Sequence, residues 1–233
     1  MRFPSDLLEG RLIKRYKRFL ADFELEDGSV VTAHCANPGS MKSLLDQPVK
    51  GWLSRARPGR KLPFTWEVAE LGKTRVYVNP VGANRVVTSA IVSSAIPELC
   101  GYDVLRTEVA YGRGSRIDIL LTGSPAPAYV EVKNVTMSLG NGRAAFPDSV
   151  TARGAKHLVE LSEVARGGGR AVLFFCVSRT DAVSVEAAAD IDPLYSRTLI
   201  EAMNEGVEVL AYTGSIEPTG FRLERRLPFL SNR

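Results

Sequence analysis

The sequence predicts a mixed α/β fold in two parts, a small β-barrel followed by a sheet packed against helices. The chain has 233 residues, a length between one large domain and two small ones. Up to about residue 80, short strand-like runs alternate with turn signals, and beyond it strand-like and helix-like segments follow one another. The basic excess is also confined to the first part: residues 1–80 hold 14 Lys and Arg against 9 Asp and Glu, whereas residues 81–233 hold 16 against 17. We therefore expect two domains, 1–80 and 81–233.

Residues 1–80 predict a closed barrel of the OB type. The candidate strands are residues 11–16, 19–25, 30–35, 51–55, 65–71 and 75–79. In the second of these, Phe19, Ala21, Phe23 and Leu25 share one face, the period-two pattern of a half-buried strand. Asp27-Gly28 and residues 71–73 are hairpin turns, and residues 37–41 form a turn that opens a short helix. Short strands with one helical insertion are typical of an OB-type barrel, which commonly binds oligonucleotides on one face.

Residues 81–233 predict an α/β or α+β sandwich of a sheet and helices. Asp148 is the expected cap of a helix that reaches Ala165, and Asp192-Pro193 opens another that stops at Gly206. The expected elements are, in order, a helix over 83–96, strands over 103–111, 116–121 and 129–135, the Asp148 helix, a buried strand over 171–177, the Asp192 helix, a strand over 207–212 and a final ribbon near 221–227.

Composition narrows the class of protein. With 45% hydrophobic and 24% charged residues, the chain has the composition of an ordinary soluble globular protein. The longest clean apolar run, residues 171–177, is too short to span a membrane, and the amino terminus lacks the apolar region of a secretory signal. The three cysteines are odd in number and far apart, without a Cys-x-x-Cys pair. These features predict reduced thiols and a cytoplasmic location, without a zinc site or a disulfide framework.

Two basic clusters in the first part are candidates for binding nucleic acid. The first comprises Arg11, Lys14, Arg15, Lys17 and Arg18, interleaved with Tyr16 and Phe19; the second comprises Arg55, Arg57, Arg60 and Lys61, just before Phe64 and Trp66. Basic side chains neutralise phosphates and aromatic rings stack on unpaired bases, so this combination suits a nucleic-acid surface. The alternative is a solvated positive face above aromatic residues that belong to the core. A protein-interaction module without nucleic acid would leave the charge imbalance unexplained.

Charged residues interrupt two neighbouring apolar strands in the second part. Asp118 lies opposite the apolar face of its strand, and Glu131 and Lys133 point together from the next strand. If these strands pair, the two carboxylates converge and repel each other unless a cation lies between them, which predicts a Mg²⁺ or Mn²⁺ site. Lys133 would then stabilise the charge that develops on a phosphodiester, as in the Asp…Glu-x-Lys arrangement of metal-dependent nucleases. The alternative is an ordinary exposed strand face with a surface ion pair.

Further residues are candidates for the same site. Nucleases of this kind often supply another carboxylate from the first helix, but residues 83–96 contain none. Glu98 and Glu108 are the nearest replacements, and Asn84 is a neutral substitute. This gap favours a site that binds without cleaving. His157, beside Lys156 on the next helix, could contact phosphate or orient a water, although a partly exposed helix histidine is the commoner arrangement.

Sequence motifs spread along nearly the whole chain resemble the sugar fermentation stimulation protein A family. They are HCANPGSM (34–41), RKLPFTWEV (60–68), VNPVGANR (78–85), GSRIDILL (114–121), YVEVKNVT (129–136), FPDSVTARGAKHLVEL (146–161) and the IDPLY…GVEVLAY stretch (191–212). The family's common Pro-Asn-Thr form is replaced by Ala-Asn-Pro at residues 36–38.

The resemblance implies an OB-like amino-terminal domain and a carboxy-terminal domain similar to PD-(D/E)XK nucleases. It also implies DNA binding and an association with the regulation of sugar (maltose) use in bacteria. By position, the nuclease-like metal ligands fall on Asp118 and Glu131 and the catalytic lysine on Lys133. Two functions follow as expectations: a DNA-binding, metal-dependent nuclease, and a non-catalytic DNA-binding regulator on a degenerate nuclease fold.

Overall fold

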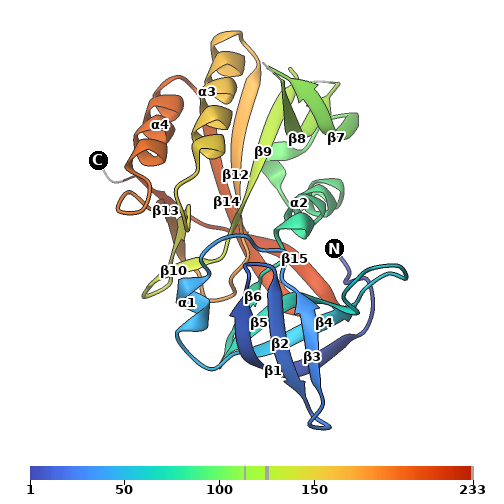
Figure 1. Ribbon diagram of the computed structural model, residues 1–233. Coiled ribbons are helices and arrows are strands. Elements are labelled where there is room, and N and C mark those ends of the chain that lie inside the picture. Colours follow the sequence, from blue (N-terminus) through green and yellow to red (C-terminus); the bar gives the residue numbers. More distant parts are fainter. Residues whose placement is uncertain (113, 124–125, 232–233) are drawn as a thin grey trace.

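A closed barrel forms the first part of the chain in the computed structural model, which describes residues 1–112, 114–123 and 126–231 (Figure 1). Its strands are β1 (Leu7–Tyr16), β2 (Leu20–Leu25), β3 (Val30–His34), β4 (Lys50–Arg55) and β5 (Phe64–Leu71). The antiparallel order β3-β2-β1-β4-β5 closes through a parallel pairing of β3 with β5, in which Ala33 lies opposite Phe64. The short helix α1 (Lys42–Leu45) precedes β4, and β6 (Thr74–Tyr77) continues from β5 as a hairpin. The predicted OB-type barrel is confirmed.

The barrel core is built around Trp66 and Phe23, which are both fully buried. Their rings meet edge to face with centroids 5.2 Å apart, and Trp66 Nε1 donates a hydrogen bond of 2.8 Å to the carbonyl of Val68. Gly51 is required beside them, because a Cβ there would lie 2.1 Å from Phe23 Cε1. Phe64 is also buried. The expectation that Phe64 and Trp66 offer stacking faces to bases is therefore wrong, and they belong to the core.

A mixed sheet forms the second part, with helices on both faces. Its strand order is β15-β14-β12-β9-β8-β7, and the three central strands β14, β12 and β9 run parallel. The strands are β7 (Val104–Tyr111), β8 (Ser115–Thr122), β9 (Ala128–Val135), β12 (Arg170–Val177), β14 (Glu208–Glu217) and β15 (Gly220–Arg226). One hydrophobic core lies between this sheet and α2 (Ala83–Val92), and another lies between the sheet and the pair α3 (Ala152–Arg166) and α4 (Pro193–Asn204). The predicted α/β sandwich is confirmed.

A second, smaller sheet was not predicted. It has the order β10-β11-β13-β16, formed by β10 (Met137–Gly140), β11 (Arg143–Phe146), β13 (Ser184–Ala187) and β16 (Phe229–Leu230). In Figure 1, α1 of the barrel lies beside β10, and the Ser43 hydroxyl accepts a hydrogen bond from the backbone N–H of Ser138 at 3.2 Å. These strands have two to four residues each, too few to show a hydrophobic period.

Helix α2 ends earlier than predicted, at Val92 instead of residue 96. Ser94 adopts a left-handed conformation (φ 57°) and donates its backbone N–H to the carbonyl of Ile91 at 2.9 Å. The N–H of Ala95 reaches back to the carbonyl of Ala90, also at 2.9 Å, so the last carbonyls of the helix are satisfied. A 3₁₀ turn, η2 (Pro97–Leu99), follows, as the proline requires.

Helix α3 begins later than predicted, because its cap is Thr151 and not Asp148. The Thr151 hydroxyl accepts the backbone N–H of Gly154 at 3.0 Å. Asp148 instead faces the barrel, where its carbonyl accepts a hydrogen bond from the Ser40 hydroxyl at 3.1 Å. The segment between Asp148 and Thr151 therefore joins the two parts of the molecule before the helix starts.

This assignment of the cap predicts different stabilities for two alanine variants. Thr151→Ala should lower the free energy of unfolding by about 1 kcal/mol, because the N–H of Gly154 loses its partner. Asp148→Ala should change it by less than about 0.5 kcal/mol, because the hydrogen bond from Ser40 goes to the backbone carbonyl, which alanine keeps. Urea unfolding followed by circular dichroism measures both. A larger loss for Asp148→Ala than for Thr151→Ala would contradict the assignment.

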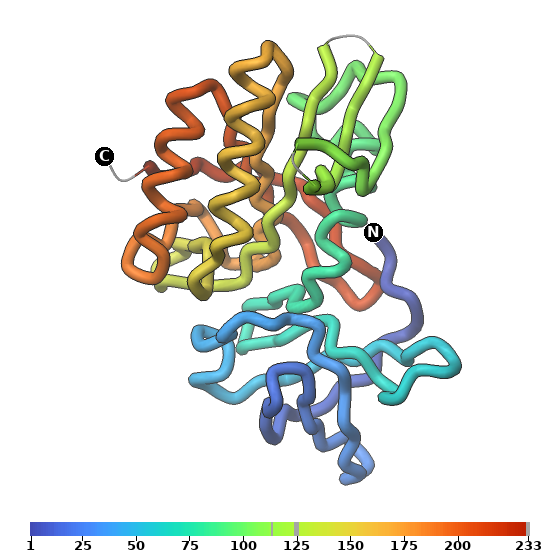
Figure 2. Tube along the Cα trace, turned by 45° about the horizontal axis from the view of Figure 1, so that its top comes forward, coloured from blue at the N-terminus to red at the C-terminus, as the bar shows by residue number. Residues whose placement is uncertain are grey.

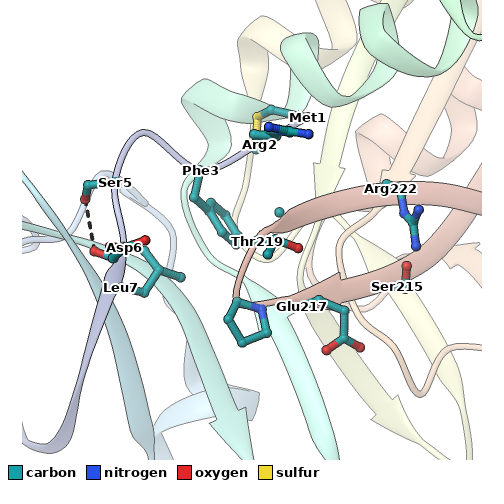
Figure 3. Close-up of a pocket in the computed structure, with 12 residues that line it drawn as sticks. Met1, Arg2, Phe3, Ser5, Asp6, Leu7, Ser215, Glu217, Thr219 and Arg222 are labelled. Atoms are coloured by element: carbon teal, nitrogen blue, oxygen red, sulfur yellow. Dashed lines mark hydrogen bonds between the residues drawn. The ribbon is translucent and has the colours of Figure 1, made fainter.

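The barrel and the larger sheet share backbone hydrogen bonds. Tyr77 of β6 donates its N–H to the carbonyl of Ser178, and Thr180 donates to the carbonyl of Arg75. Figure 2 shows the amino-terminal segment running beside the β14–β15 hairpin, where Phe3 donates to the carbonyl of Thr219 at 3.3 Å. A cavity of about 890 Å³ lies between this segment and the hairpin (Figure 3). The two parts therefore contact each other along both β6 and the amino-terminal segment.

Within the described part of the chain, no helix is long and apolar enough to cross a membrane. Cys35, Cys100 and Cys176 are all unpaired thiols, and the first and last of them are buried.

Candidate metal and nucleic-acid site

The candidate site lies where β8 and β9 separate. The two strands pair only over Ile119–Leu121 and Ala128–Val130, with Ile119 opposite Val130. The next residues in this register are Asp118 and Glu131. Beyond the last pair, the Asp118 carboxylate replaces the missing strand partner, because its Oδ2 accepts the backbone N–H of Val132 at 2.7 Å. The structure thus brings Asp118 to β9, as the sequence predicts.

Asp118 is held between α2 and the sheet. Asn84 of α2 donates its side-chain N–H to Asp118 Oδ1 at 2.7 Å and approaches Glu108 Oε1 at 3.5 Å. Burial, and then the charge of Glu131, raise the pKa of Asp118, and the hydrogen bonds from Val132 and Asn84 only partly oppose this. Of the candidates for a further ligand, Asn84 contacts Asp118 directly. Glu108 is linked to Asp118 only by the side chain of Asn84, which lies between them.

Glu131 is almost completely buried, with 2% of its surface exposed. Its Oε1 accepts hydrogen bonds from Lys133 Nζ, at 2.6 Å, and from the His157 ring, whereas its Oε2 is buried without a hydrogen-bond partner. Burial alone would raise the pKa of Glu131, but the hydrogen bond from His157 and the charge of Lys133 outweigh it and lower the pKa. Glu131 is thus a buried carboxylate with one oxygen unused.

His157 fixes the orientation of Glu131. His157 is buried, whereas a partly exposed histidine is the commoner arrangement on a helix. Arg153 Nε donates a hydrogen bond of 3.3 Å to its Nε2. Because Nε2 accepts this bond, the ring proton lies on Nδ1 and points at Glu131. Lys156, the neighbouring candidate, places its Nζ 3.5 Å from Glu160 Oε1 on the next turn of the helix.

Glu98 is not brought to the site. Its carboxylate accepts a hydrogen bond from the Tyr212 hydroxyl at 2.7 Å and pairs with Arg226 at 2.9 Å. Tyr212 and Arg226 belong to β14 and β15, which β12 and β9 separate from β8. Glu98 is therefore wrong as a candidate ligand beside Asp118.

Two residues near the site, Glu160 and Tyr111, were not predicted from the sequence. Glu160 is buried, accepts a hydrogen bond from the Ser115 hydroxyl at 2.9 Å, and keeps an Oε2 without a hydrogen-bond partner. The Tyr111 hydroxyl is also buried and unpaired, and burial together with the charges of Glu131, Glu160 and Asp118 raises its pKa. The signal for Glu160 was its position three residues after His157, which places both on one face of α3.

Most side chains of the first basic cluster form ion pairs or hydrogen bonds with other residues of the barrel. Arg11 pairs with Glu24, and Lys14 lies 3.7 Å from Asp22. Arg15 donates to the carbonyls of Asn37 (2.9 Å) and Gly39 (3.0 Å), and Arg18 donates to that of Pro38 (3.2 Å), so these two hold the turn before α1. Lys17 is exposed, and its side chain makes no hydrogen bond or ion pair with another described residue.

The second basic cluster makes fewer contacts within the described part of the protein than the first. The guanidinium of Arg55 lies 5.7 Å from the centre of the Phe64 ring. Arg57, Arg60 and Lys61 are exposed in the β4–β5 loop, and their side chains pair with no other residue that the structure describes. These three side chains are available to an anionic partner.

A cavity of about 500 Å³ on the barrel surface brings basic residues of the second cluster beside Tyr16, which is interleaved with the first. Its lining includes Tyr16 and His34 from β1 and β3, and Arg60 and Lys61 from the β4–β5 loop. The exposed ring of Phe19 stacks beside His34 with centroids 6.4 Å apart. The structure thus places basic and aromatic groups around one hollow on the β2–β3 side of the barrel.

The raised pKa of Asp118 predicts how stability depends on pH without metal. Because its pKa is higher in the folded than in the unfolded chain, the folded state binds more protons and stability falls as pH rises through this window. Asp118→Asn should therefore be more stable than the unsubstituted protein near pH 7, and the difference should shrink towards pH 4. Urea midpoints in chelator at both pH values measure this, and a difference independent of pH would contradict it.

The fold and the site together define a class of protein: an OB-type barrel joined to a mixed α/β sheet that carries a carboxylate pair and a lysine. Residues 13–78 match the "SfsA N-terminal OB domain", and residues 82–220 match the "Sugar fermentation stimulation protein RE domain". The chain belongs to the sugar fermentation stimulation protein family.

Individual relatives agree with this assignment over the whole chain. Sugar fermentation stimulation protein homologs from Maricaulis maris (97% of both chains covered) and Pelobacter propionicus (99% of this chain and 100% of the relative) are each 52% identical. A solved structure described as Pyrococcus furiosus SfsA in complex with Ca²⁺ has a TM-score of 0.89 at 23% identity, with 99% of this chain and 98% of that chain covered. This last comparison establishes the similarity of fold.

Proposed function

We propose that the protein binds nucleic acid, in the first place DNA, and hydrolyses phosphodiester bonds at the site formed by Asp118, Glu131 and Lys133. The observation that carries this proposal is the approach of two carboxylates, one half-buried and one fully buried, with a lysine amine 2.6 Å from the buried one. The charge of Glu131 helps to raise the pKa of Asp118, and a bound cation would oppose this effect. The unused Oε2 of Glu131 is available as a ligand atom for that cation.

The residues present fit Mg²⁺ or Mn²⁺. Both ions prefer carboxylate oxygens, and Mg²⁺ is usually held by one or two carboxylates together with waters and substrate phosphates. Asp118 and Glu131 supply two such carboxylates. Within the described part of the chain, no group of three or more His, Cys, Asp or Glu side chains is close enough to hold a metal ion, so waters and substrate would complete the coordination. The Pyrococcus furiosus protein is described as a complex with Ca²⁺, another cation that prefers oxygen ligands, which supports this choice.

The residues of the site have separate tasks in this proposal. The bound cation would polarise the phosphodiester and acidify a water. Lys133 donates to the phosphate oxygen on which negative charge accumulates in the transition state. His157 keeps Glu131 ionised and in place, and Arg153 fixes the tautomer of His157. Asn84 keeps Asp118 directed at β9.

The hollow on the barrel is the proposed contact for the rest of the strand. Arg60 and Lys61 bind phosphates there, and Tyr16 and Phe19 offer rings to unpaired bases. A nucleic-acid partner and three unpaired thiols support a cytoplasmic location.

Calorimetry with Mn²⁺ and Mg²⁺ tests the site, with cleavage of labelled single- and double-stranded DNA and RNA followed on the same samples. The protein should bind the ions saturably, and Asp118→Asn/Glu131→Gln should lose both ion binding and cleavage. Glu98→Gln is the matched control, because the structure ties Glu98 to Tyr212 and Arg226 instead. Cleavage that survives the double substitution would overturn the proposal.

One observation favours a second candidate, a DNA-binding regulator without catalysis. Helix α2 contributes the neutral Asn84 where a third carboxylate would strengthen the metal site. In that case the protein would bind DNA equally well with and without divalent ions, and Asp118→Asn/Glu131→Gln would not change the affinity. The calorimetric and cleavage experiment above separates the two candidates.

Nucleic-acid binding has its own prediction. Arg57→Gln/Arg60→Gln should weaken binding at low salt and reduce the slope of log K against log salt by about 1.4 for single strands, about 0.7 for each lost phosphate contact. The reason is that fewer counterions are released on binding. Fluorescence anisotropy over a salt series measures the slope. Arg166→Gln/Arg197→Gln, on the outer helices, is the control and should leave it unchanged; equal effects of both pairs would contradict the prediction.

A further inference from the structure

A smaller cavity, of about 240 Å³, lies between the barrel and the second part of the chain, including the smaller sheet. The barrel supplies the turn that contains Asn37 and Gly39, and the second part supplies Asn134 of β9 and Asp148. Asn134 directly follows Lys133 in β9, and Pro80, also on the wall, begins the short turn η1 (Pro80–Gly82) that leads into α2 and Asn84. The walls of this cavity therefore continue into the elements that carry the candidate catalytic site.

The polar groups of this cavity are complementary to the edge of a nucleobase. The Asp148 carboxylate makes no hydrogen bond or ion pair with any other described residue, so it offers a free acceptor. Asn134 Oδ1 accepts the Ser178 hydroxyl at 2.5 Å, which leaves the side-chain N–H groups of Asn134 as donors. Pro38, Phe146 and Pro147 provide apolar surface for the faces of a planar ring.

Charge and size exclude other parts of a nucleic acid from this cavity. The free carboxylate of Asp148 disfavours a phosphate inside the cavity, so the backbone is expected at its rim, where the exposed Arg18 also belongs to the lining. An exocyclic amino group, in contrast, donates well to a carboxylate. A cavity of this volume suits one nucleobase and not a base pair. A base inside it must therefore be unpaired and unstacked.

We propose that this cavity is a base subsite: it takes one unpaired nucleobase with an exocyclic amino group, next to the phosphodiester that Lys133 faces. The inference rests on the proposed function and narrows its substrate class to nucleic acid that is single-stranded at this point. Cytosine, adenine and guanine carry the amino group, and thymine and uracil do not. The turn that Arg15 and Arg18 hold in place is then one wall of the base subsite.

The test compares binding of oligo-dC and oligo-dT of equal length by fluorescence anisotropy in chelator, where no cleavage occurs. The protein should bind oligo-dC about tenfold more tightly, the discrimination that hydrogen bonds to a base edge provide. Asp148→Ala should abolish this preference, and Asp190→Ala, at an exposed aspartate without a partner among the described residues, should keep it. Since Thr151 caps α3, the Asp148 variant retains its helix.

A second variant displaces the carboxylate without removing it. A Cβ at Gly39 would lie 2.1 Å from Asp148 Oδ2, so Gly39→Ala should also lower the preference for oligo-dC. Equal affinity of the unsubstituted protein for oligo-dC and oligo-dT, or an unchanged preference in Asp148→Ala, would overturn the base subsite. An abasic strand bound as tightly as oligo-dC would overturn the subsite alone and leave the proposed phosphate contacts intact. Absence of binding to every strand would overturn the proposed function and the base subsite with it.

Discussion

Lys133→Met is expected to lower the rate of phosphodiester hydrolysis by about 10²–10³-fold, the loss typical of removing one donor to the developing charge of a transition state. Lys133 Nζ lies 2.6 Å from Glu131 Oε1 and is largely buried, so its charge acts at a fixed position. Glu131 keeps its hydrogen bond from His157 in the variant. Binding of Mn²⁺ should therefore survive, and single-turnover cleavage together with calorimetry measures the two effects separately.

Lys156→Met is the matched control for this experiment. Lys156 lies on α3 next to His157 but pairs with Glu160 on its own helix. Its substitution should lower the cleavage rate by a factor at least about ten times smaller than the Lys133 substitution does, because the Lys156 amine pairs with Glu160 and not with Glu131. Equal losses at the two lysines would mean that Lys133 acts only through the general charge of the region.

Trp66→Ala should lower the free energy of unfolding by about 3–5 kcal/mol, the usual cost of removing a large aromatic side chain from a core. Trp66 is fully buried against Phe23, and its Nε1 is hydrogen-bonded to Val68 inside the barrel. Because a domain of this kind is stable by only about 5–15 kcal/mol, this variant loses a large part of its stability. Urea unfolding measures the change.

Trp66→Phe separates the structural effect from a direct contact with nucleic acid. It keeps most of the buried ring and should bind oligonucleotides as the unsubstituted protein does, with a smaller loss of stability than the alanine variant. A strong loss of affinity in a well-folded Trp66→Phe would show that the indole contacts bases after all. Phe19→Ala is the useful comparison, because Phe19 is 45% exposed beside the barrel hollow and should lose affinity without losing much stability.

Strand periodicity made most of the barrel and the larger sheet predictable. Strands such as β2, which alternates apolar and polar residues, and β12, which is almost continuously apolar, have patterns that are visible without knowledge of their partners. The carboxylate pair was predictable for the same reason: Asp118 and Glu131 interrupt apolar strands, and a charge in such a position needs a partner. The convergence of Lys133 on Glu131 follows from their spacing of two residues on one strand face.

Contacts between distant segments were not predictable from the sequence. The short strands β10, β11, β13 and β16 have too few residues for a period, and their pairing depends on the rest of the fold. Burial of Trp66 and pairing of Arg15 with the turn before α1 are likewise consequences of barrel closure. Glu160 looked like an ordinary helix carboxylate, because only the packed structure buries it beside Ser115.

The hydrogen bonds between β6 and the segment around Ser178 have a consequence for synthesis of the chain on the ribosome. Thr180, whose hydroxyl accepts the N–H of Arg75, comes 105 residues later in the sequence. At about 5–20 residues per second, the barrel therefore emerges and folds roughly 5–20 s before this partner exists. During that interval the edge of β6 is open to pairing with another nascent chain. Arg75, Lys73 and Glu70 surround this edge with charge, which is how strand edges commonly avoid aggregation until their own partner arrives.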